Sequence, residues 1–171
     1  AVAVDSSGDV VWTGSFLGIT NVGGSLLTST GLFYDDVFVA KYSGVDGRHL
    51  WSRSFGGTQS DFGDSIAVDR AGDVFVAGTF GTTVNFGGGT VTSAGLRDSF
   101  VAKYSGADGR FLCSRPIGGL LNEWDIEVAV DASGNVVVTG WFEGSVDFGA
   151  GALMSAGNSD VFLAKYSGVN G

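Results

Sequence analysis

One five-residue sequence, Ala-Lys-Tyr-Ser-Gly, occurs three times in this chain at nearly equal intervals. It occupies residues 40–44, 102–106 and 164–168. A second repeated sequence, Ala-Val-Asp, ends at Asp5, Asp69 and Asp131. When residues 66–109 are aligned with residues 128–171 without a gap, about half of the positions are identical. A regular period of about 62 residues indicates one structural unit that is built in series, so the chain is a repeat protein.

Each unit has the pattern of strands joined by turns. The expected strands of the second unit are residues 66–68, 74–80, 99–104 and 111–117. They are rich in β-branched and aromatic residues, and they are separated by Gly- and Asp-containing turn sequences. No segment shows the apolar period of a helix. Four antiparallel strands per unit, joined in series, form the blade of a β-propeller, so the sequence predicts an all-β fold with nearly three blades.

The chain is interpreted as a single propeller segment. The expected blades are residues 1–65, residues 66–127 and, without an outer strand, residues 128–171. The fourth strand is assigned to the outer edge because Pro116 lies in it and proline cannot donate to a sheet ladder. The units are longer than a usual blade, and the extra residues between the second and third strands predict a small additional hairpin. The expected hairpins span Ile19–Leu27, Thr83–Ser93 and Ser145–Met154.

These repeated sequences resemble the bacterial β-propeller repeat called SBBP and are similar to the NHL-type blade. The resemblance rests on Ala-Val-Asp-x-x-Gly, on Phe-Val-Ala-Lys-Tyr and on Leu-Trp-Ser-Arg-x-Phe-Gly-Gly. It implies a propeller in a secreted or cell-surface bacterial protein, and it supplies no catalytic residues. Propellers close with about 4–8 blades, so we expect either a longer parent chain or association of copies, with two copies giving about six blades. Because the only methionine is Met154, we also expect a processed or excised piece.

Composition excludes several classes of protein. The formal net charge is −9, which disfavours a nucleic-acid partner. One cysteine excludes an intrachain disulfide framework and a multi-cysteine metal site. The apolar runs are too short for a membrane span. We therefore expect no cofactor, no metal, and either self-association or a glycan or protein ligand.

The lysines form one repeated column. Lys41, Lys103 and Lys165 occupy equivalent positions, and each has an acid five residues before it. These acids are Asp36, Asp98 and Asp160. A lysine between packed sheets needs a partner, so a structural ion pair or hydrogen bond is the favoured interpretation. The alternative is a ring of positive charges that meets an anionic ligand.

Two sets of carboxylates are candidates for other roles. Asp5, Asp69 and Asp131 each precede a turn in which the side chain can accept backbone N–H groups, and the alternative is a Ca²⁺ ligand. The second set lies in the expected linkers between blades, where the repeats differ and a ligand site is favoured. It consists of Asp61, Asp64, Glu123 and Asp125.

A third column lies in the expected hairpins. It consists of Asn21, Asn85 and Asp147, with Phe86 and Phe148 following the last two. An aromatic ring beside an amide or acid can bind a sugar, and the alternative is packing of the hairpin on the blade. His49 and Cys113 align with large apolar residues of the neighbouring copy, so both are assigned to packing.

The sequence predicts a non-catalytic binding or adhesion module with no catalytic residues. Two alternatives remain. The first is a structural unit in which copies share or complete blades. The second, ranked lower, is a glycan-binding lectin or an enzyme.

Overall fold

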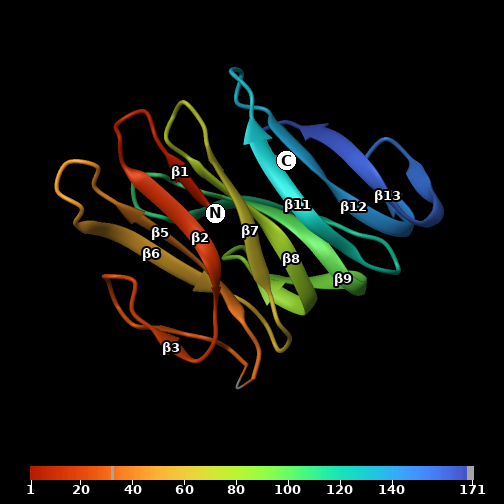
Figure 1. Cartoon of the computed structure of the whole chain (residues 1–171), viewed down its shortest axis with the longest axis horizontal. Coiled ribbons are helices and arrows are strands. Elements are labelled where there is room, and N and C mark those ends of the chain that lie inside the picture. The colour runs from red at the N-terminus through yellow and green to blue at the C-terminus, as the bar shows by residue number, and fades with distance from the viewer. Residues whose placement is uncertain (32, 169–171) are drawn as a thin grey trace.

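The computed structural model describes residues 1–31 and 33–168. These residues form strands and turns without a helix (Figure 1), so the all-β prediction is confirmed. No part of the described chain is a helix long and apolar enough to cross a membrane.

The strands form three main antiparallel sheets that follow the repeats. The first contains β1 (Val2–Val4), β2 (Val10–Phe16), β5 (Asp36–Tyr42) and β6 (His49–Phe55). The second contains β7 (Phe62–Val68), β8 (Val74–Asn85), β9 (Thr90–Tyr104) and β10 (Phe111–Ile117). The third contains β11 (Glu123–Val130), β12 (Val136–Asp147) and β13 (Ala152–Tyr166). The predicted four-stranded antiparallel sheet is therefore confirmed in the first two repeats.

The sheets lie side by side in chain order, and the first strands β1, β7 and β11 follow one another along one side (Figure 1). One core lies between the first and second sheets and a second core lies between the second and third. The middle sheet is covered on both faces, which explains why the run Val74–Ala77 is apolar without alternation and fully buried.

Pro116 is on the edge strand β10, which pairs with β9 and with no other strand in the described part of the chain. A missing N–H is tolerated there because no further strand needs it. The predicted place of this proline is confirmed.

The additional hairpin is separate only in the first repeat, where it forms β3 (Ile19–Thr20) and β4 (Leu27–Thr28). In the second and third repeats the expected hairpin is the continuation of the two middle strands. Residues Thr83–Asn85 extend β8 and pair with Thr90–Thr92 of β9, beyond an irregularity between Gly81 and Thr83. A bulge bends a strand without ending it, so one long hairpin replaces the expected separate element.

The first strands of the second and third sheets begin earlier than predicted. β7 starts at Phe62 and β11 at Glu123, each with a register shift in the ladder to the next strand. Asp64 and Asp125 are thus strand residues, not linker residues, and Asp125 takes a positive φ of 53° beside the shift. The bulges accommodate acidic residues that count against a strand in the sequence.

Candidate functional site: the junctions between sheets

Each repeated lysine forms an ion pair with the aspartate of Ala-Val-Asp in its own repeat. Lys41 Nζ lies 2.8 Å from Asp5 Oδ2, and Lys103 Nζ lies 3.2 Å from Asp69 Oδ2. The third repeat has the same pair, Lys165 with Asp131. The acids five residues before the lysines are not their partners, because they accept hydrogen bonds from the backbone N–H groups of Thr30, Ala94 and Ala156 instead.

The first two lysines also cross to the next sheet. Lys41 Nζ donates to the Gly106 carbonyl at 3.1 Å, and Lys103 Nζ donates to the Gly168 carbonyl at 3.1 Å. A lysine engaged with a carboxylate and a carbonyl joins two repeats. This geometry does not present a ring of free ammonium groups to an anionic ligand.

The aspartates of these pairs use both oxygens. Asp5 Oδ1 accepts the N–H groups of Ser7 at 2.8 Å and Asp9 at 3.0 Å, and Asp69 and Asp131 accept the equivalent N–H groups. Burial raises the pKa of Asp5, but the hydrogen bonds from Lys41, Asp9 and Ser7 outweigh it and lower that pKa. The predicted Asx-type turn is confirmed, and the oxygens that a Ca²⁺ ion would need are occupied by N–H and ammonium groups.

Of the other acids of the lysine column, Asp36 and Asp98 are buried and Asp160 is half-buried. Asp36 Oδ2 accepts the N–H and hydroxyl of Thr30, and Asp98 Oδ2 accepts the N–H of Ala94 at 2.9 Å. The other oxygen, Oδ1, has no hydrogen-bond partner among the described residues in either case. Desolvation by burial raises the pKa of both carboxyls. In the third repeat Asp160 accepts the N–H of Ala156 in the same way.

The four linker candidates divide into two kinds. Asp61 and Glu123 are equivalent residues that are wholly buried, and they accept the N–H groups of Gly57 at 2.7 Å and Gly119 at 3.2 Å. Desolvation by burial raises the pKa of each to about 7. They hold the chain where it passes from one sheet to the next, so a ligand cannot reach them. The other two, Asp64 and Asp125, lie at exposed positions of β7 and β11.

The hairpin column caps turns. Asn21 Oδ1 accepts the N–H of Gly23, while Asn85 Oδ1 and Asp147 Oδ1 each accept two glycine N–H groups in their turns. The sugar-binding interpretation does not fit Phe86, which is only 3% exposed and packs against Phe100 with ring centroids 4.7 Å apart. Phe148 is half-buried and stacks on Phe162 at 4.4 Å.

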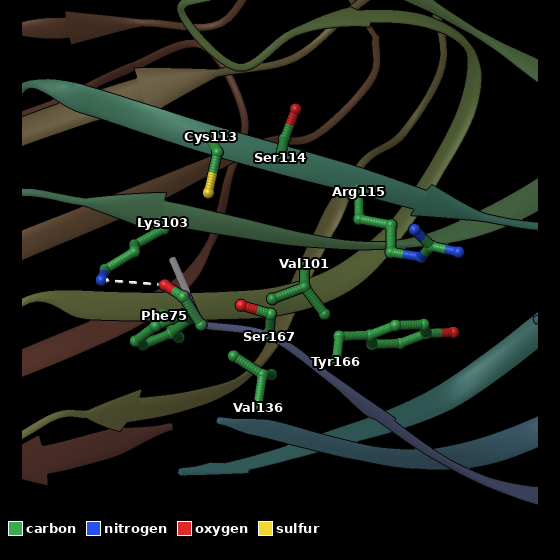
Figure 2. A pocket seen from close by; sticks show the side chains of 10 residues that line it. Phe75, Val101, Lys103, Cys113, Ser114, Arg115, Val136, Tyr166 and Ser167 are labelled. Atoms are coloured by element: carbon green, nitrogen blue, oxygen red, sulfur yellow. Dashed lines mark hydrogen bonds between the residues drawn. The ribbon is translucent and has the colours of Figure 1, made fainter. Parts of the chain in front are cut away.

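A hollow at the second junction was not predicted from the sequence. It lies between the second and third sheets, and Cys113 lines it at the position where the first repeat has Trp51 (Figure 2). The alignment of these two residues was visible in the sequence, but the space that the smaller side chain leaves was not. His49, by contrast, packs edge-on against Tyr42 and beneath Gly24, as its assignment to packing requires.

The adjacent antiparallel sheets, two of four strands and one of three, and the repeated contacts between them are similar to those of a propeller-type repeat protein. The family model of the β-propeller repeat, SBBP, matches residues 50–87, which run from β6 of the first sheet through β8 of the second. The resemblance stated from the sequence is thus confirmed in this stretch, which crosses one complete junction.

A curated relative is an uncharacterized WD repeat-containing protein of Acanthamoeba polyphaga mimivirus. It is 26% identical over 194 residues, an alignment that covers 92% of this chain and 12% of the relative. The chain therefore spans about an eighth of the length of that relative. The likeness is to another propeller-type repeat, and it supports the repeat rather than any particular ligand.

Proposed function

We propose that this chain is a non-catalytic protein-interaction module whose two outer sheet faces bind further propeller blades. The observation that carries the proposal is the exposure of apolar side chains at positions that are packed inside the two junctions. The β-propeller repeat match and the WD-repeat relative support a module of this class.

The outer face of the first sheet exposes Val2 and Trp12, the first of them to 66%. Their equivalents in the second sheet, Ile66 and Val76, are buried in the core of the first junction. Phe16, Phe38 and Ala40 of this face are buried beneath the β3–β4 hairpin, so the open part is the one that carries Val2 and Trp12. That part has the composition of an interface without its partner.

The outer face of the third sheet is the other half of the same interface. Leu163 is 76% exposed, whereas its equivalent in the second sheet, Val101, is buried in the core of the second junction. Val161 is exposed beside it on β13. The two open faces therefore differ. The open face of the first sheet corresponds to the side that the second sheet packs against the first, and the open face of the third sheet corresponds to the side that the second sheet packs against the third. The two open faces are thus the two complementary sides of one kind of junction.

The substitution Leu163→Glu tests the proposal. We expect it to lower the binding of an apolar dye and any self-association of the chain, because it replaces an exposed apolar side chain of the open face with a charge. The matched control is Val45→Glu, since Val45 is 93% exposed in a turn and belongs to neither face. Equal effects of both substitutions would contradict the assignment of this face to binding.

A second candidate function is assembly, in which the further blades come from a second copy. Among the described residues, strand β13 is paired only with β12, so its other edge has no strand beside it there, and an open edge favours strand pairing between chains. Unlike faces that meet head to tail form a closed ring when the rotation allows it. Two copies would then close about six blades.

Light scattering over a concentration series distinguishes the two candidates. A mass of twice 17.5 kDa supports assembly of copies. A monomer at every concentration contradicts assembly, and the interaction module then binds blades from another source.

The resemblance to the bacterial repeat supports a secreted or cell-surface location, which we include in the proposal. Fractionation of the source cells with an antibody against the chain tests it, and recovery in the cytoplasmic fraction would contradict it.

A further inference from the structure

The hollow at the second junction is lined by side chains of both sheets. Its walls are Phe75, Val101 and Cys113 from the second sheet and Val136 and Tyr166 from the third (Figure 2). Its space amounts to about 320 Å³ when counted to the open mouth. The Gly168 carbonyl lies at its end and accepts a hydrogen bond from Lys103 Nζ.

The first junction shows what fills this place in a complete repeat. The indole of Trp51 is buried there, and its Nε1 donates to the Gly106 carbonyl at 3.0 Å. The ring belongs to the same core as Val39, Val74 and Tyr104. An indole is thus held by an apolar slot with one carbonyl acceptor at its end.

The residues that line the hollow at the second junction are equivalent to the residues that surround Trp51 at the first. Val101, Val136 and Tyr166 are the equivalents of the residues around Trp51, and Gly168 is the equivalent of Gly106. The position of the indole itself is taken by Cys113. The same environment therefore occurs at both junctions, but an indole ring occupies it at the first junction alone.

One neighbouring residue limits the space. Phe75 stands where the first repeat has Val11, and Lys103 Nζ lies 4.9 Å from the centre of its ring. The larger side chain fills part of the volume that the missing indole leaves. The hollow has room for about one water molecule, at 20 Å³, so a ring enters it only when the walls move outward.

We propose that this hollow is a binding site for a flat heteroaromatic ring with an N–H donor, of the indole class. The ring lies between Val101 and Val136, and its N–H donates to the Gly168 carbonyl as Trp51 does to Gly106. The ammonium of Lys103 and the guanidinium of Arg115, which lies 4.3 Å from the Tyr166 ring centre, flank the site. A neutral ring is therefore favoured over a cationic one.

Titration of the whole chain with indole, followed by calorimetry and ligand-detected NMR, tests the site. We expect a dissociation constant of about 1 mM, which is usual for a small ring without further contacts. Cys113→Trp places the chain's own ring in the slot, so it should abolish indole binding. Cys113→Ala is the matched control, because it keeps the space and should keep the binding.

The first junction provides an independent variant. Trp51→Cys opens the equivalent slot, so a folded Trp51→Cys protein should bind a second indole. N-acetyl-tryptophan amide distinguishes the source of the ring: binding of the amide assigns the site to a tryptophan side chain of a peptide, and binding of indole alone assigns it to a small molecule. Absence of indole binding to the natural chain, or equal binding by Cys113→Trp, would overturn the proposal.

Discussion

Lys41 Nζ lies 2.8 Å from Asp5 Oδ2, and the two side chains are only 8% and 4% exposed. The pair joins β5 to the turn after β1, and the lysine also reaches the Gly106 carbonyl of the next sheet. Removal of one partner leaves an uncompensated charge in a site that water does not reach.

Lys41→Met is therefore expected to destabilise the fold by about 3–5 kcal/mol. Lys165→Met is the contrast, because its pair with Asp131 is 56% and 29% exposed and Asn135 stands where Lys41 has a second carboxylate, Asp9, at 3.3 Å. An exposed pair contributes about 0–1 kcal/mol. Urea unfolding of the two variants measures both values, and equal losses would show that burial does not govern these pairs.

Glu123 should make stability depend on pH near neutrality. Its folded pKa is about 7, above the value of 4.5 for a free glutamate, because burial disfavours the charged form. The folded state then binds more protons than the unfolded state between these pH values. The stabilisation is complete below pH 4.5, is lost as the pH rises to about 7, and stays lost above it.

Glu123→Gln should remove this part of the slope and stabilise the protein above pH 7. In the natural chain Glu123 Oε1 has no hydrogen-bond partner among the described residues. An amide group can therefore replace the carboxyl without loss of the hydrogen bond that Glu123 Oε2 accepts from Gly119. Asp61→Asn is the contrast, because both Asp61 oxygens accept an N–H and one of them would be lost. Thermal melts across the pH range test this, and an unchanged slope in Glu123→Gln would contradict it.

The repeat made much of the fold predictable from the sequence. The strand Phe111–Ile117 was predicted with its observed bounds, and the edge position of Pro116 followed from its missing N–H. The early starts of β7 and β11 were not predictable, because Asp64 and Asp125 oppose a strand by composition. These acidic residues fit into the strands because each lies at a bulge. A bulge forms between two paired strands, so the sequence of one strand does not predict it.

The site was less predictable for a similar reason. The sequence offered two acids for each lysine column, and only the pairing of β2 with β5 brings the Ala-Val-Asp carboxylate to Lys41. The burial of Phe86 was not predictable because a repeated Phe beside a turn has the same pattern whether it faces solvent or a neighbouring sheet. Phe86 is a core residue because the first sheet packs against it.

Gly118 should not tolerate a side chain. A Cβ on this residue would lie 2.1 Å from Asp98 Cγ, so Gly118→Ala forces the buried carboxyl to move. We expect a loss of about 1–3 kcal/mol, the usual cost of overpacking. Gly157→Ala is the control, because nothing lies within 4 Å of its Cβ position. Chemical unfolding compares them, and a neutral Gly118→Ala would show that the Asp98 carboxyl is free to shift.

Phe86→Ala tests packing against sugar binding in the hairpin column. Phe86 packs against Phe55 of the first sheet with ring centroids 5.4 Å apart, so its removal should cost about 3–5 kcal/mol. Phe148→Ala should cost less, because Phe148 is only half-buried. Thermal unfolding measures the difference, and a glycan array run on the natural chain and both variants gives the second readout. Loss of a glycan signal in Phe86→Ala without loss of stability would contradict the packing role and restore the sugar-binding interpretation.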